Sequence, residues 1–290
     1  MSIPILILLV LTSLGLFFGF VLAYSNKKFG IEVNPLIHIV EDILPKGQCG
    51  ACGYAGCMAY AEAVVTNADV PPNLCTPGKD AIAKLVAELT GKAAAPMEPQ
   101  IAQVKCAGTD SKASKAYDYN GVEDCVAANL LFSGPKNCKY GCLGLGTCVK
   151  SCPFDAMTMS EDGLPIINPD KCTACSKCVS VCPKQIITLM PIGAKVRVNC
   201  SSKDKGAVAK KACTIACIGC SLCMRQCPHG AIKMENNLAI VDSKICEEVC
   251  SDALCLSKCP TKAIRPFVTG IVPGTESNEN VVAACASCAK

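Results

Sequence analysis

Cysteine is the residue type in this chain that could carry chemistry, because it is both abundant and closely spaced. The 290 residues include 26 cysteines but only two histidines, His38 and His229. Thiolates in tight, repeated runs are the ligands of iron–sulfur clusters, whereas zinc modules often add histidine. The composition therefore favours iron–sulfur clusters and one-electron chemistry.

Four cysteine runs end in Cys-Pro, and two of them have the regular CxxCxxCxxxCP spacing of bacterial cluster proteins. The regular runs are Cys172, Cys175, Cys178, Cys182 and Cys217, Cys220, Cys223, Cys227; the expanded runs are Cys138, Cys142, Cys148, Cys152 and Cys246, Cys250, Cys255, Cys259. In paired runs three cysteines bind one cubane and the cysteine before proline reaches the neighbouring cluster. We therefore expect the crossed ligand sets Cys138/Cys142/Cys148/Cys182, Cys172/Cys175/Cys178/Cys152, Cys217/Cys220/Cys223/Cys259 and Cys246/Cys250/Cys255/Cys227.

A further set of cysteines precedes these runs. Cys49, Cys52 and Cys57 lie in a short glycine-rich loop, and Cys75 follows two prolines. Glycines let a backbone wrap a cluster and direct N–H groups at its sulfurs. We expect these four cysteines to bind another [4Fe–4S] cluster, so that the chain carries about five clusters.

Six cysteines fit none of these ligand sets. They are Cys106 and Cys125 before the first pair of runs, Cys200 and Cys213 before the second pair, and Cys285 and Cys288 in a C-terminal CxxC. The first four are interpreted as buried thiols that pack beneath the clusters, with a redox pair as the alternative. The CxxC is interpreted as part of an inert tail.

The composition also bears on the other classes of protein that are rich in cysteine or basic residues. Disulfide scaffolds are usually short secreted domains, so a zinc-binding scaffold is the alternative from outside redox chemistry. The formal charge of +4 does not indicate a nucleic-acid partner, because each bound cubane adds about −2 and basic residues do not cluster with aromatics. The sequence has no glycine-rich nucleotide motif, so we expect neither flavin nor NAD on this chain.

The elements that must position these cysteines begin with an apolar N-terminal segment. Ile3 to Tyr24 are 22 residues without a charged side chain, which as a helix would cross about 30 Å of hydrocarbon. Lys27 and Lys28 follow, and the positive-inside rule keeps them cytoplasmic. We expect a single-pass membrane anchor at 1–28 with the N-terminus outside and the cluster domains in the cytoplasm; a cleaved signal peptide is the alternative.

The rest of the chain is predicted to be an α+β protein built from small modules. Alternating hairpins at 156–167 and 231–241 each lie between two cysteine runs, as is typical of two-cluster ferredoxins. We expect an α-rich single-cluster module at 34–92 with helices at 58–67 and 79–90, a flexible linker at 92–100, ferredoxin-like two-cluster modules at 101–192 and 195–268, and a flexible tail at 269–290.

The order of these features resembles the B-subunit family of the Rnf complex, the ion-translocating ferredoxin:NAD⁺ oxidoreductase. Local strings at 48–57, 139–144 and 217–220 are similar to that family as well. The resemblance implies an electron-carrying subunit that takes electrons from reduced soluble ferredoxin and passes them towards a membrane iron–sulfur centre, flavin subunits and an NAD-binding subunit, coupled to Na⁺ or H⁺ export. The high density of cysteines indicates an anaerobic organism. A carrier for a hydrogenase or a carbon-monoxide dehydrogenase is the alternative redox assembly.

Overall fold

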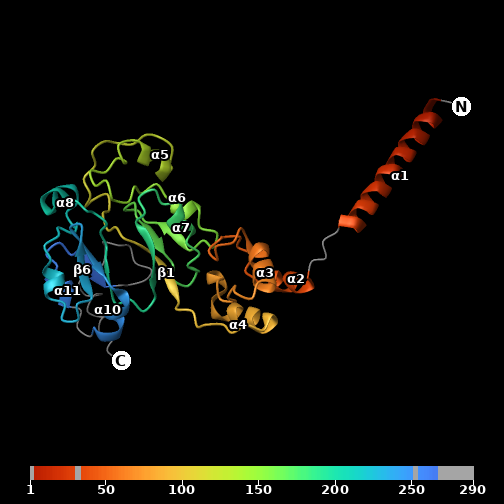
Figure 1. The fold of residues 1–290 in the computed structure, drawn as a ribbon. Helices are drawn as coiled ribbons and strands as arrows, with labels where there is room; N and C mark the ends of the chain where they lie inside the picture. The colour runs from red at the N-terminus through yellow and green to blue at the C-terminus, as the bar shows by residue number, and fades with distance from the viewer. Residues whose placement is uncertain (1–2, 30–33, 251–253, 267–290) are drawn as a thin grey trace.

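The first element of the chain is a long apolar helix. A computed structural model describes residues 3–29, 34–250 and 254–266, and Figure 1 shows helix α1 (Ile3–Phe29) at one end of the molecule. Its 27 residues have a mean hydropathy of 2.8 over the most apolar window, and none of that window is buried. Length and composition are therefore sufficient for one membrane crossing. The predicted tail at 269–290, with Cys285 and Cys288, lies outside the described residues.

Short helices form the module that follows. They are α2 (Pro35–Ile43), α3 (Cys57–Thr66), the 3-10 turn η1 (Thr76–Gly78) and α4 (Lys79–Thr90). Helix α4 ends at Gly91, whose φ of +67° favours glycine. The module packs around Val40, Tyr60, Val64 and Val86, which are almost completely buried. The two predicted helices are present, one of them shifted by a single residue.

The predicted linker begins as part of this module. The structure describes no helix or strand between α4 and strand β1 (Gln100–Val104). However, the Lys92 ammonium donates hydrogen bonds to the carbonyls of Val64, Asn67 and Val70 at 2.6–2.8 Å. These carbonyls lie at and just after the C-terminal end of α3, so Lys92 ties the start of the linker to the module.

The remainder of the described chain repeats one topology twice. In the first copy β1 pairs with β4 (Ile187–Pro191), and the hairpin β2 (Met157–Met159) and β3 (Pro165–Ile167) lies between them in sequence. In the second copy β5 (Val196–Val198) pairs with β8 (Ile264–Pro266) around the hairpin β6 (Ile232–Glu235) and β7 (Leu238–Val241). All four pairings are antiparallel, and both predicted hairpins are present.

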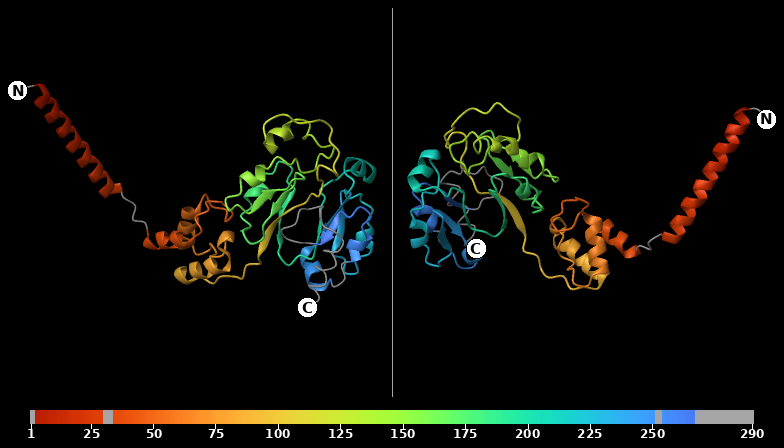
Figure 2. Two further views of the ribbon diagram at one scale, coloured as in Figure 1. Left: turned by 180° about the vertical axis from the view of Figure 1, so that it is seen from behind. Right: turned by 45° about the horizontal axis from the view of Figure 1, so that its top comes forward.

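Short helices lie before or within the cysteine runs in both copies. The first copy contains α5 (Cys125–Leu130), α6 (Thr147–Lys150) and α7 (Lys177–Ser180), and the second contains α8 (Gly206–Ala212), α9 (Leu222–Arg225), α10 (Ser243–Val249) and α11 (Leu254–Lys258). The two copies lie next to each other, and the chain enters the first copy from the N-terminal module through strand β1, as both views of Figure 2 show.

Cysteines are members of the cores rather than surface additions. The first copy packs Leu164, Ile186 and Ile187 against cysteine side chains, and the second packs Val196 and Ile264 in the same way. An isolated two-stranded sheet is only marginally stable. The cysteines, and any cofactor that they bind, must therefore contribute to the stability of the fold.

Candidate iron–sulfur sites

The N-terminal site comprises Cys49, Cys52, Cys57 and Cys75. Burial raises the pKa of Cys75 to about 11, and the thiols of the other three, which lie close to it, act in the same direction. The loop is closed by Gln48, whose Oε1 accepts a hydrogen bond from the Cys57 N–H at 3.1 Å. Gly56 has φ of +126°, and a Cβ there would collide with Gln48 Oε1. The four cysteines predicted to act together are therefore neighbours.

The Cys152 site is a cavity lined by Cys152, Cys172, Cys175 and Cys178. Cys152 thus lies with the following run and not with its own, as the crossed pairing predicts. Its Sγ accepts a hydrogen bond from the Ala156 N–H at 3.4 Å. Burial is the main reason that the pKa of Cys178 is raised to about 12, and the neighbouring thiols raise it further.

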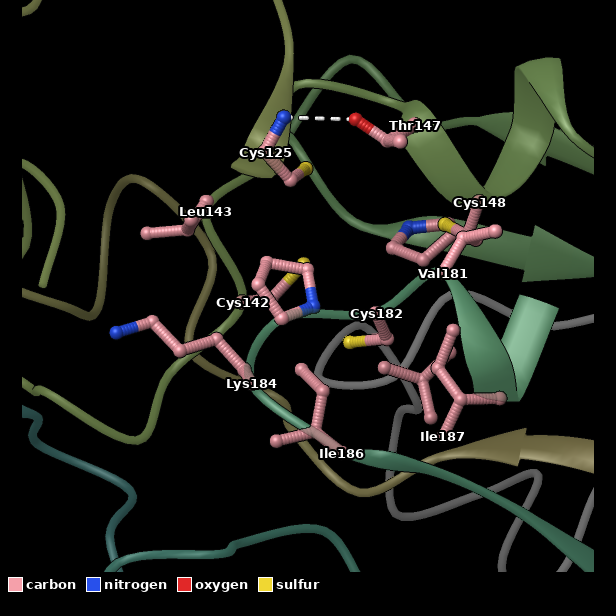
Figure 3. Close-up of a pocket in the computed structure, with 13 residues that line it drawn as sticks. Cys125, Cys142, Leu143, Thr147, Cys148, Val181, Cys182, Lys184, Ile186 and Ile187 are labelled. Carbon is pink, nitrogen blue, oxygen red and sulfur yellow. Dashed lines mark hydrogen bonds between the residues drawn. The ribbon is translucent and has the colours of Figure 1, made fainter. Parts of the chain in front are cut away.

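The Cys182 site is drawn in Figure 3, where four thiols face a common space. They belong to Cys125, Cys142, Cys148 and Cys182, and the apolar side chains of Ile186 and Ile187 close one side. Burial raises the pKa of Cys148 to about 12, with the charges of Cys125 and Cys182 as the next causes. Cys182, the last cysteine of the later run, thus lines a cavity with Cys142 and Cys148 of the earlier run.

One member of this site differs from the predicted ligand set. Cys138 does not line the cavity, and Cys125 occupies the place expected for it. Three residues separate Cys138 from Cys142 and five separate Cys142 from Cys148, so the expanded loop can turn Cys138 away from the other two. The same finding replaces the interpretation of Cys125 as a packing thiol.

A hydrogen-bond network positions Cys125. Asp124 caps helix α5 by accepting hydrogen bonds from the N–H groups of Val126 and Ala127 at 2.8 and 2.9 Å. Its second oxygen accepts from the Thr147 hydroxyl at 3.0 Å, and Thr147 Oγ1 accepts from the Cys125 N–H at 2.7 Å, the dashed line in Figure 3. Such capping fixes the first turn of a helix, and here that turn carries the thiol.

The second copy contains two corresponding sites. The Cys259 site is a cavity lined by Cys217, Cys220, Cys223 and Cys259. At the Cys227 site burial raises the pKa of Cys255 to about 12, and Cys246, Cys250 and Cys227 contribute in the same direction because their thiols are close. Both sets are the crossed sets expected from the Cys-Pro spacing.

Four cysteines line one more cavity, which we call the junction cavity. They are Cys106, Cys138, Cys200 and Cys213. The sequence pattern predicts packing thiols for three of them and places Cys138 as a ligand elsewhere, so their convergence is a correction to both interpretations. The only sequence signals of this set are the irregular spacing after Cys138 and the matching positions of Cys106 and Cys200 just after strands β1 and β5.

The donor sets fit [4Fe–4S] clusters. A cubane takes four thiolates, and N–H groups directed at sulfur are its usual second layer. Among the described residues no group of three or more histidine, cysteine or acidic side chains converges as it would around a single metal ion. The thiols instead surround spaces of about 320, 330 and 350 Å³ at the Cys259, Cys152 and Cys182 sites.

Neighbouring thiol sets lie close enough to influence each other. The pKa of Cys175, raised chiefly by burial, is also affected by Cys49 of the N-terminal site. Cys178 and Cys148 link the Cys152 and Cys182 sites in the same way, and Cys255 and Cys223 link the two sites of the second copy. Repeated modules with adjacent four-thiol sets define an iron–sulfur protein of the polyferredoxin class.

Comparisons with known proteins agree with this class. Residues 44–77 match the Fe-S cluster family, residues 137–187 the 4Fe-4S dicluster domain and residues 216–233 the 4Fe-4S binding domain. The B subunit of the proton-translocating ferredoxin:NAD(+) oxidoreductase complex of Clostridium ljungdahlii is 62% identical over 93% of this chain and 95% of its own. The B subunit of the ion-translocating oxidoreductase complex of Methanosarcina acetivorans is 42% identical over 88% of this chain and 96% of its own.

A third relative is the B subunit of the Na(+)-translocating ferredoxin:NAD(+) oxidoreductase complex of Acetobacterium woodii. It is 41% identical over 88% of this chain and 75% of its own. The chain belongs to the B-subunit family of the ion-translocating ferredoxin:NAD⁺ oxidoreductase (Rnf) complex. The resemblance noted from the cysteine runs is confirmed.

Proposed function

We propose that this chain is the electron-transferring subunit of an ion-translocating ferredoxin:NAD⁺ oxidoreductase complex, which takes electrons from reduced soluble ferredoxin and delivers them towards the membrane subunits. The observation that carries the proposal is the series of adjacent four-thiol sets. Five of these sets, the N-terminal, Cys152, Cys182, Cys259 and Cys227 sites, would each hold one [4Fe–4S] cluster. The relatives' names support an assembly that couples the transfer to export of Na⁺ or H⁺.

The protein residues have three tasks in this function. A bound cubane supplies reversible one-electron chemistry. Cysteine thiols provide the ligands and must lose their protons when iron binds. Because burial raises the pKa of thiols such as Cys148 and Cys178, their deprotonation is coupled to metal binding. Apolar residues such as Leu164 and Ile232 exclude water from the sites, and backbone amides such as Ala156 N–H donate to sulfur and so favour the charged cluster.

Helix α1 would hold the cluster modules at the cytoplasmic face of the membrane. Its apolar side chains are exposed, Leu16 at 76% for example, and Lys27 and Lys28 lie in its last turn. An exposed apolar helix of this length is stable in lipid, and the lysines favour the cytoplasmic side. The N-terminus would then lie outside and the flavin and NAD sites on partner subunits.

Electron paramagnetic resonance (EPR) on native membranes tests this function. Reduced ferredoxin added to anaerobic membranes should produce [4Fe–4S]⁺ signals that disappear on addition of NAD⁺. A chain lacking residues 3–29 should appear in the soluble fraction and abolish the NAD⁺-dependent reoxidation. Cluster signals that do not change on addition of reduced ferredoxin or NAD⁺ would instead favour a carrier for another redox assembly.

A further inference from the structure

The junction cavity brings together thiols from four separate parts of the chain. Cys106 follows β1, Cys138 begins the first run, Cys200 follows β5 and Cys213 follows α8. The cavity encloses about 380 Å³ including its mouth, slightly more than the spaces at the three other lined sites. Cys106, Cys138 and Cys213 are mutual neighbours, since the charges of Cys106 and Cys138 both affect the pKa of Cys213, which burial chiefly raises.

Backbone pairing between the two copies creates this convergence. The N–H of Ala107 donates to the Asn199 carbonyl at 3.1 Å, and the N–H of Ser114 donates to the Ala212 carbonyl at 3.0 Å. The N–H of Thr214 donates in return to the Lys112 carbonyl at 3.0 Å. Residues 106–114 of the first copy are thereby fixed against residues 199–214 of the second, with the cavity between them.

Backbone amides are directed at these sulfurs as they are at the Cys152 site. Cys106 Sγ accepts hydrogen bonds from the N–H groups of Gly108 and Cys142, both at 3.4 Å. Cys200 Sγ accepts from the Ser202 N–H at 3.5 Å. Donors of this kind stabilise thiolates that bind clusters, and a structural thiol has no need of two.

The cavity wall also offers an unsatisfied donor and a close backbone. Asn199 is only 2% exposed, so its side-chain nitrogen Nδ2 is buried and has no water to bond to. It also has no hydrogen-bond partner among the described residues. A sulfur atom inside the cavity would be an acceptor for it. A Cβ at Gly108 would lie 3.5 Å from the sulfurs of both Cys106 and Cys213, so the backbone at Gly108 borders both thiols.

The charge around the cavity suits an anion. The Lys136 side chain, 2% exposed, lines the cavity, and its ammonium pairs with Asp110 at 3.1 Å and donates to the Gly108 carbonyl at 3.0 Å. Asp110 also pairs with Lys115 at 3.2 Å. Two lysines sharing one carboxylate leave a local positive excess, which complements the charge of about −2 on a cubane with four thiolates.

We propose that Cys106, Cys138, Cys200 and Cys213 hold a further [4Fe–4S] cluster at the junction of the two ferredoxin-like copies. Its position joins two otherwise separate series of sites. Cys106 accepts the N–H of Cys142 from the Cys182 site, and Cys200 lies against the backbone N–H of Cys217 from the Cys259 site. The inference goes beyond the five sites proposed above by making the series continuous.

Loading of this site is a ligand exchange without electron transfer. A preformed [4Fe–4S]²⁺ core, held by thiolates of the cell's cluster-assembly machinery, exchanges four iron–thiolate bonds to its carrier for four bonds to the cysteines. The four cysteine protons pass to the leaving carrier thiolates. The product carries a net charge of about −2. The Lys136 ammonium lines the cavity and balances part of that charge.

Iron and acid-labile sulfide counts on the anaerobically purified full-length chain test the proposal. Six sites predict about 24 iron atoms per chain and five sites predict about 20, at four per cubane. A Cys213→Ala variant should lose about four iron atoms, or one if a [3Fe–4S] cluster remains. Cys220→Ala, which removes a ligand of the Cys259 site, is the matched control and should cause a loss of the same size.

The outcomes separate this inference from the proposed function. An iron count of about 20 in the wild type, with Cys213→Ala unchanged and Cys220→Ala reduced, overturns the junction cluster and leaves the five sites intact. A count far below 20 overturns both. Mössbauer spectra of the wild type give the fraction of its iron that is in [4Fe–4S] clusters, and this fraction multiplied by the iron count gives the number of cubanes per chain. A variant that fails to fold therefore does not remove the test.

Discussion

At the residue scale the distinctive property of this chain is that a cysteine and its sequence neighbours serve different sites. Cys152 ends the first run but lines a cavity with Cys172, Cys175 and Cys178. Cys138 begins that run and lines the junction cavity. The cavity that a cysteine lines is therefore not determined by the run in which the cysteine occurs.

Replacing Cys152 with alanine tests the crossed arrangement. We expect Cys152→Ala to lose about four iron atoms per chain, or one if a [3Fe–4S] cluster forms, because one thiolate of four is removed. The lost EPR signal should be the one also lost in Cys175→Ala. Cys148→Ala, which alters the same run as Cys152, is the control and should remove a different signal. Identical spectra for the Cys152 and Cys148 variants, different from Cys175→Ala, would contradict the pairing.

At the element scale short helices and strand pairs do the positioning. The strongest example is the N-terminus of α5, where Asp124, Thr147 and the Cys125 N–H form one connected network. The pKa of Asp124 is lowered by the backbone N–H of Ala127 and then by the Thr147 hydroxyl, so the carboxylate is charged at neutral pH. This network couples the helix cap to the Cys182 site.

Asp124→Ala should therefore loosen one site selectively. The substitution removes the cap and the hydroxyl acceptor, so Cys125 is held less firmly. We expect iron release to a chelator to become several-fold faster for about one cluster's share of the iron, with the rest unchanged. Asp124→Asn keeps an acceptor at the cap and should behave much more like the wild type. Uniformly faster release from all sites would show that Asp124 acts on global stability instead.

Elements that depend on local sequence patterns could be predicted, and contacts between distant segments could not. Periodicity and turn residues predicted α3, α4 and both hairpins, because those elements depend on local patterns. The spacing CxxCxxCxxxCP predicted the thiol groupings at the Cys152 and Cys259 sites, because two-residue gaps keep three thiols in one loop. The grouping at the Cys227 site was predicted from pairing the expanded run Cys246, Cys250 and Cys255 with the preceding Cys-Pro. The junction cavity depends on backbone pairing between residues 106–114 and 199–214, whose hydrogen-bonded partners are 92 to 102 residues apart in sequence. No local pattern encodes such a pairing, and so spacing alone groups Cys138 with its own run.

At the scale of the whole molecule, cofactors replace much of a conventional core. The described sheets have two strands each, and cysteines belong to two of the three largest apolar clusters and pack against the third. Small modules of this kind need a metal or another cross-link to be stable. Electron transfer and folding therefore depend on the same thiols.

Removal of iron should consequently unfold the modules and spare the anchor. Because structural metal sites contribute their binding free energy to folding, we expect exhaustive anaerobic chelation to abolish cooperative thermal unfolding of residues 34–266. Limited proteolysis of membranes should then degrade these modules while α1 remains in the membrane. A chelated protein that keeps its protease resistance and its unfolding transition would show that the apolar clusters suffice without iron.

The central claim is that neighbouring thiol sets hold clusters in a continuous series. EPR of the fully reduced, full-length chain tests it most directly, because paramagnetic clusters in adjacent sites broaden and split each other's signals. We expect a strongly interacting spectrum that integrates to about one spin per cubane, with about five or six spins per chain. A spectrum of sharp, independent signals, or an EPR-silent protein that contains zinc, would contradict it.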